Sequence, residues 1–343
     1  MRRTTHKIYG TSPKSHSMGS NLERYVLPKV PDWVIEDGRP VEVVPVTRLS
    51  ELGAGKGGKL FNWRRPTFVS TEDSIQCKVV PGVAYVRHYG LLVATAANLH
   101  HKTINVTAII PAKTEIRNFI SCTLPKLPFA DVIVLGYVDR IRIGNSDYVP
   151  WVTSAGWGWK LVDVKNRHVL LLGCEFSFWG DVSGYLVAEL FTRKVSDWVL
   201  YVGKLGTLNS TIIPNRVLAT GNQSLVYGRF VEWEGYLMDI LASSSNIFCD
   251  AKHITVDSVV EETTDWLSQY VATYDLVDPE IGHMGLVAQK FKAMFDYFHI
   301  VTDCLSADYG VGLYNERSTI IEAHRKELLD QASTLIEYAI ISR

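Results

Sequence analysis

The alternation of apolar and polar positions is most informative between Tyr274 and Asp303. Short apolar runs, Tyr274–Val277 and His299–Thr302, flank a segment whose apolar side chains recur at the three-and-four spacing of an amphipathic helix. We therefore expect a strand, a helix and a second strand, joined as a right-handed crossover between parallel neighbours. The apolar positions of the expected helix are Met284, Val287, Ala288, Phe291, Met294, Phe295 and Phe298.

From residue 103 onwards, strand-like apolar runs alternate with helical patterns. This alternation predicts an α/β fold with a mixed, mostly parallel central sheet flanked by helices. The expected strands are Ile104–Pro111, Asp131–Val138, Tyr148–Val164, His168–Gly173, Asp197–Val202 and Ile254–Val260, together with a paired Arg216–Thr220 and Gly228–Trp233. The expected helices are Thr114–Cys122, Gly180–Lys194, Asp265–Tyr274 and a long one that begins near Glu316.

The first hundred residues follow a different pattern. Residues 1–22 contain few apolar side chains, and we expect them to form a mobile tail. Residues 23–102 read as an N-terminal extension, with an extended Pro- and Val-rich part and short strands or a hairpin between residues 67 and 101. The expected organisation is therefore a disordered tail (1–22), an extension (23–102) and an α/β domain (103–343).

Composition narrows the possible classes of protein. Apolar residues make up 47% of the 343 residues and charged residues 21%, as in a globular protein with a substantial core. The net charge of −1 gives no bulk attraction to nucleic acid or to an anionic membrane. No apolar run approaches the roughly 20 residues that cross a bilayer. The five cysteines lie far apart and form no Cys-x-x-Cys pair, which favours reduced thiols, no metal site and a cytoplasmic location.

Acidic residues follow both strands of the expected crossover. Asp278 and Glu280 come after the first strand, and Asp303 comes after the second. Parallel neighbours lie roughly 5 Å apart, so these acids would share the carboxyl edge of the sheet, where α/β folds bind ligands. Taken singly, Glu280 could cap the next helix and Asp303 could be an exposed turn residue. Their shared position favours a ligand site.

At this point the order of elements resembles that of the nucleoside phosphorylase and nucleosidase superfamily. The resemblance covers about residues 103–343, without the first hundred, and implies that family's fold and cleavage or transfer at the C–N bond of a nucleoside. The matching pieces are Val106–Pro111 with the loop to Glu115, Leu171–Gly173 with the helix after it, Tyr201–Gly206, Val277–Glu280 and Val301–Asp303.

The resemblance also implies roles for individual residues. Asp303 would give a proton to the leaving base, and Glu280 would hold the ribose hydroxyls. Asp278, Gly203 and Lys204 would also border the substrate. The resemblance implies a small nucleoside-like substrate, phosphate as a second partner if the reaction is phosphorolysis, no metal or organic cofactor, and assembly as a homo-oligomer.

Departures from the family pattern keep alternatives open. The loop that binds phosphate in the family lacks its glycine in this sequence, and Tyr201 stands where the family usually has an arginine. Lys113, Arg117 and Lys204 are therefore the candidates for anion binding. Glu115 stands near the position of the nucleosidases' general base, which favours hydrolysis over phosphorolysis.

Phe178 and Trp179 make the second glycine loop bulky. They would either line a reshaped substrate pocket or belong to the core. The rival hypothesis is that the fold serves ligand binding or a different reaction, without nucleoside cleavage.

Overall fold

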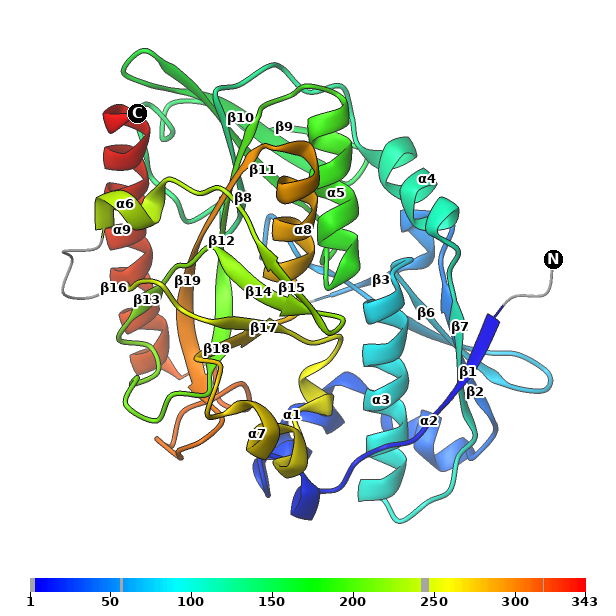
Figure 1. The fold of residues 1–343 in the computed structure, drawn as a ribbon. Helices are drawn as coiled ribbons and strands as arrows, with labels where there is room; N and C mark the ends of the chain where they lie inside the picture. The colour runs from blue at the N-terminus through cyan, green and yellow to red at the C-terminus, as the bar shows by residue number, and fades with distance from the viewer. Residues whose placement is uncertain (1–3, 56–57, 242–246, 317) are drawn as a thin grey trace.

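The computed structural model describes residues 4–55, 58–241, 247–316 and 318–343. Within these ranges the chain forms a five-stranded sheet, a twelve-stranded sheet and a two-stranded ribbon (Figure 1). The two larger sheets lie side by side, with α3 (Val83–Leu99) and α5 (Asp181–Thr192) packed against each other between them.

The smaller sheet has the order β1-β7-β2-β6-β5. Its central strand β2 runs parallel to both neighbours, whereas β1 and β5 pair antiparallel at the edges. β6, α3 and β7 therefore form a crossover that passes over β2. The strands are β1 (Thr4–Ile8), β2 (Val41–Pro45), β5 (Thr67–Ser70), β6 (Ile75–Val79) and β7 (Val106–Ile110), and the ribbon joins β3 (Gly53–Ala54) to β4 (Arg64–Arg65).

Three expectations about the N-terminal part are wrong. Thr4–Ile8, expected to be mobile, pairs with β7 as an edge strand. β7 itself, expected to open the α/β domain, belongs to the smaller sheet. The run from Val83 to Leu99 is a helix rather than strands, because α3 is covered on several sides by α1, α5 and the sheet and so has no broad polar stripe to reveal its period.

The larger sheet has the order β15-β14-β17-β18-β12-β8-β11-β10-β9, with β19 on the other side of β12 and β13 and β16 beyond it. β12 is parallel to β8 and β19, and antiparallel to β18 over two residues. The strands are β8 (Val132–Gly136), β9 (Val152–Ser154), β10 (Trp157–Val164), β11 (Arg167–Cys174), β12 (Trp198–Thr207), β13 (Leu218–Ala219), β14 (Gln223–Val226), β15 (Arg229–Glu232), β16 (Ile247–Phe248), β17 (His253–Thr255), β18 (Leu276–Asp278) and β19 (Met294–Cys304).

Helices cover both faces of this sheet (Figure 1). α5 and α8 lie on the face towards the smaller sheet, and α9 lies on the opposite face, so that one apolar core forms on each side of the central strands. The helices not yet bounded are α1 (Asn21–Val26), α2 (Asp32–Asp37), α4 (Lys113–Thr123), α6 (Leu237–Leu241), α7 (Thr264–Tyr270), α8 (Ile281–Phe291) and α9 (Thr319–Ser342), with 3₁₀ turns η1 (Pro13–Ser15), η2 (Leu27–Lys29), η3 (Leu49–Glu51) and η4 (Val259–Glu261). Among the described residues no helix combines the length and apolarity that a membrane crossing requires.

The crossover expected around Tyr274–Asp303 differs from the observed one in two respects. The helix ends at Phe291, where Lys292 adopts the left-handed conformation, and β19 starts at Met294. Because most of β19 is buried, apolar residues at 294, 295 and 298 reflect burial and not helical period. In addition, β18 and β19 each border β12 and do not pair with each other, and β18 runs antiparallel to β12 whereas β19 runs parallel to it. The expectation of parallel neighbours whose acids share one carboxyl edge is therefore wrong, because the two strands end in opposite directions.

The expected pairing of Arg216–Thr220 with Gly228–Trp233 is also wrong. β13 pairs with β16 and β19, and β15 pairs with β14. The remaining expected strands and helices from residue 131 onwards correspond to observed elements in position, with two exceptions. Tyr148–Val164 divides into the antiparallel strands β9 and β10, and Ile254–Val260 divides into β17 and η4.

Candidate functional site

Asp278, the last residue of β18, lies at the centre of a buried polar cluster. Its Oδ1 accepts hydrogen bonds from the backbone N–H groups of Glu280 (3.1 Å) and Ile281 (2.9 Å), and so caps α8. His253 Nε2 lies 3.0 Å from Oδ1, and His299 Nε2 lies 3.8 Å from Oδ2. Burial pushes the pKa of Asp278 upward, but the His253 contact, both imidazoles and the Ile281 N–H hold it below its usual value.

Gly203 on β12 provides the space that lets His299 approach Asp278. The two residues are paired across β12 and β19, and a Cβ at position 203 would lie only 2.6 Å from His299 Nε2. The imidazole also meets the Tyr201 ring edge-on, with 4.5 Å between centroids. The glycine expected to border a substrate is thus covered by a histidine side chain.

Glu280 is buried next to this cluster, with 7% of its surface exposed. Its carboxyl group bonds to that of Asp278 and to the N–H of Gly180 at the start of α5. Burial, then the Asp278 charge, raise the pKa of Glu280 well above its usual value and so favour its protonated form.

Phe178 lies near this region, 5.6 Å from the Tyr201 ring. Trp179 instead stacks on His88 of α3 at 4.4 Å and donates its Nε1–H to the carbonyl of Asp257 (2.8 Å). Trp179 therefore connects the layers of the two sheets and does not extend towards Tyr201.

Asp303 and Lys204 lie towards the ends of β19 and β12. Thr302 Oγ1 donates to Asp303 Oδ1 at 2.9 Å, and burial raises the pKa of Asp303 to about 6. Lys204 Nζ donates to both carboxylate oxygens of Glu316 at 2.8 Å. The Lys204 charge lowers the pKa of both Glu280 and Asp303, so both acids lie within range of this cation's charge.

The N-terminal part of the chain covers the end of the sheet where Asp303 lies. α1 lies where β19 finishes and β18 begins (Figure 1). Its Tyr25 is buried, and its pKa is raised by burial and by the charges of Glu262, Glu316 and Asp303. No motif marks Tyr25, Glu262 or Glu316 in the sequence, because each reaches the site only through contacts between distant segments.

Glu115, Lys113 and Arg117 are not brought to this cluster. All three lie in α4, on the far side of the molecule from β18 in Figure 1. Glu115 Oε2 accepts the N–H of Ala112 at 2.7 Å, as a residue that caps its own helix does. The side chains of Lys113 and Arg117 are exposed. The structure therefore brings together Asp278, Glu280, Gly203, Lys204, Phe178 and Asp303, but not the expected general base or the other two cations.

Comparison with solved structures found enzymes of similar fold over part of the chain. The 5′-methylthioadenosine/S-adenosylhomocysteine nucleosidase of Campylobacter jejuni superposes with a TM-score of 0.50, covering 62% of this chain and 100% of that enzyme, at 11% identity. The chain has the nucleosidase fold. This superposition confirms the expected fold class and, at the level of fold, the resemblance to nucleosidases.

Two other structures have lower scores. Futalosine hydrolase of Helicobacter pylori covers 62% of this chain and 97% of its own, with 12% identity and a TM-score of 0.47. The nucleosidase of Colwellia psychrerythraea, solved with adenine, covers 62% and 95%, with 14% identity and a TM-score of 0.45.

Sequence comparisons give a different relative. No family model matches the sequence. Oxidoreductase cns1 of Cordyceps militaris is 24% identical over 258 residues, which are 66% of this chain and 32% of that protein. The chain therefore matches about a third of the length of this curated relative.

Proposed function

We propose that this nucleosidase-fold protein cleaves or transfers at the N-glycosidic bond of a nucleoside or nucleoside-like metabolite. The observation that supports the proposal is that two buried acids, Glu280 after β18 and Asp303 on β19, both interact electrostatically with Lys204 on β12. Asp303, with a pKa of about 6, is poised to give a proton to the departing base near neutral pH. Protonated Glu280 would hydrogen-bond the sugar hydroxyls.

We propose water as the attacking group, in preference to phosphate. Lys204 already donates to both oxygens of Glu316, and Arg325 Nη1 lies 3.5 Å from the same carboxylate. A phosphate ion would have to displace Glu316 or accept its repulsion, whereas a neutral water molecule would not. Glu115 lies in α4, away from Lys204. Its role as the general base is therefore a hypothesis that the experiment below tests.

The test is to incubate the protein with adenosine, inosine, uridine or methylthioadenosine, with and without phosphate, and to measure free base. We expect base without phosphate, and at least a hundredfold slower release by Asp303→Asn, because general acid catalysis contributes about 10²–10⁴-fold. Asp330→Asn, an exposed carboxyl on α9, is the matched control. Glu115→Gln at wild-type rate would remove Glu115 from the mechanism. Release only with phosphate would contradict hydrolysis.

A second function is supported by how deeply the candidate site is buried. Tyr25 is 6% exposed and Glu280 7%, and His299 fills the space above Gly203. A fold used to bind a ligand or to run a different reaction, without nucleoside cleavage, would tolerate such a closed site. If none of the four nucleosides yields base while calorimetry detects their binding, this second function replaces the first.

A further inference from the structure

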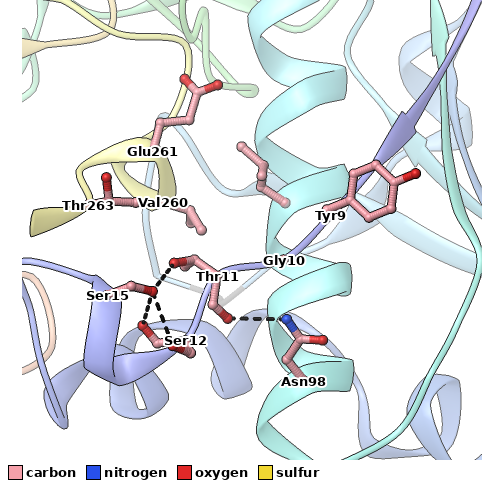
Figure 2. Close-up of a pocket in the computed structure, with 10 residues that line it drawn as sticks. Tyr9, Gly10, Thr11, Ser12, Ser15, Asn98, Val260, Glu261 and Thr263 are labelled. Atoms are coloured by element: carbon pink, nitrogen blue, oxygen red, sulfur yellow. Dashed lines mark hydrogen bonds between the residues drawn. The ribbon is translucent and has the colours of Figure 1, made fainter. Parts of the chain in front are cut away.

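A pocket of about 460 Å³ opens where the smaller sheet's layer meets the larger one (Figure 2). Three segments that are distant in sequence form its walls: residues 9–15 after β1, the middle and end of α3, and η4 with Thr263. It lies apart from Glu280 and Asp303, neither of which lines it, so it is a separate candidate site.

The wall formed by residues 9–15 is held firmly against α3. Gly10 lies so close to the helix that an added Cβ would be 2.4 Å from the backbone of Ala94. The N–H of Thr11 donates to Thr95 Oγ1 (3.1 Å), and Asn98 Nδ2 donates to the carbonyl of Thr11 (3.3 Å). Because these contacts fix its backbone, this wall is preorganised for a ligand.

Hydroxyl groups form one side of the pocket. Ser15 Oγ lies 3.2 Å from Thr11 Oγ1 and 3.1 Å from Ser12 Oγ, as Figure 2 shows. Hydroxyls both donate and accept, so this side suits a ligand hydroxyl or carbonyl. Leu91 and Val260 supply apolar lining.

The other side of the pocket carries Glu261, an acid that lies near a second carboxylate, that of Asp257. Arg87 Nη1 donates to Asp257 Oδ2 at 2.7 Å, so this guanidinium is already engaged by one carboxylate. Glu261, which lines the pocket, forms no ion pair with any residue of the described ranges. Burial and the nearby Asp257 charge raise the pKa of Glu261 to about 7, although Arg87 opposes them. A positive ligand group would relieve this repulsion.

We propose that this pocket binds a small organic amine. Its ammonium group would pair with Glu261, a short apolar stem would cross Leu91 and Val260, and a hydroxyl at its other end would bond to Thr11 and Ser15. This site is independent of the proposed nucleoside chemistry, since it involves neither Glu280 nor Asp303.

The experiment compares two probes of equal length by calorimetry at pH 8: 4-aminobutan-1-ol and butane-1,4-diol. We expect the amine to bind, and the diol, which lacks the charge, to bind about fivefold more weakly or not at all. Glu261→Gln should weaken binding of the amine by a similar factor, whereas Glu327→Gln, an exposed acid on α9, should not. Nucleoside cleavage is not part of the readout.

Equal binding of the two probes, unchanged affinity in Glu261→Gln, or no heat from the amine at about 10 mM would each overturn the proposal. If Glu261→Gln does not fold, the pH dependence of the wild-type protein decides. Three charged or titratable groups act on Glu261: Asp257 just before η4, Arg87 on α3 and the neighbouring Glu262. Asp257 is paired with Arg87, and the raised pKa of Glu262 favours its neutral form. Binding should therefore weaken from pH 8 to pH 6 as Glu261 takes up a proton, and a flat profile would contradict the site.

Discussion

Among individual residues, two buried acids, Glu262 and Glu280, stand out by their raised pKa values. Glu262 and Glu280 both have pKa values well above the usual range, in each case because burial disfavours the charged form. Glu262 Oε2 is buried without a hydrogen-bond partner among the described residues, and Asp303 adds repulsion. The folded protein therefore favours the protonated form of both acids more than the unfolded chain does.

The first prediction concerns Glu262→Gln, which imitates the protonated acid. Between the unfolded pKa of about 4.3 and the raised folded value, the folded protein holds one proton that the unfolded chain lacks. Stability therefore falls as pH rises through this window, by about 1.4 kcal/mol per pH unit for one such group. Gln removes this contribution, so the variant should gain stability relative to wild type from pH 6 to pH 8.

Denaturant unfolding at several pH values measures this difference. Other titrating groups, including the buried histidines, are common to both proteins and cancel in the comparison. Glu327→Gln, on an exposed face of α9, should show no pH-dependent difference. A constant difference between Glu262→Gln and wild type would mean that Glu262 is ionised in the folded protein.

At the scale of elements, the close pairing of β12 and β19 determines the shape of the candidate site. β19 runs parallel to β12 along ten register pairs, with one shift between Leu205 and Gly206. The absence of a side chain at Gly203 lets His299 lie across β12 towards β18, although β18 and β19 are not neighbours. Gly203 on β12 thus allows a side chain of β19 to approach one of β18, although β12 separates these two strands.

The second prediction is that Gly203→Ala destabilises the fold. The new methyl group would meet the His299 ring inside a closely packed region, and overpacking of this kind costs about 1–3 kcal/mol. The measurement is the free energy of unfolding of both single variants and of the double variant with His299→Ala. Removing the imidazole makes room, so the cost of the alanine should shrink in the His299→Ala background. Simple additivity of the two costs would show that Gly203 and His299 do not compete for this space.

On the scale of the whole molecule, the two sheets share one core and several polar contacts. Asp181 at the start of α5 accepts the N–H groups of Val83 (3.1 Å) and Ala84 (3.0 Å) at the start of α3. His88 Nδ1 lies 2.8 Å from Ser258 Oγ. Apolar residues of both sheets also belong to one continuous buried cluster.

The third prediction is therefore a single unfolding transition for the whole chain. Because the N-terminal sheet completes the packing of α3 and α5, neither part should melt alone, and calorimetric and van't Hoff enthalpies should agree. Asp181→Ala should lower the transition temperature without splitting it, since losing a helix cap costs about 1–2 kcal/mol. Two separate transitions would show that residues 4–110 fold as an independent unit.

The amino-acid sequence by itself determined the α/β class, the nucleosidase-like order of elements and most strands and helices after residue 131. Hydrophobic period depends on neighbours in the chain, so Asp278, Glu280 and Asp303 could be placed at or near strand ends without coordinates. The same local pattern misjudged α3 and β19, because an element buried on several sides loses the polar positions that reveal its period.

Only the tertiary structure decided what surrounds those acids. Lys204 meets Glu316 across 112 positions in the chain, and Arg87 meets Asp257 across 170. Such contacts arise from strand order and from the packing of two sheets, which leave no periodic trace in the sequence. For the same reason, Glu115 could match a motif and still lie in a helix far from Glu280, while unmarked Tyr25 reached the carboxyl edge.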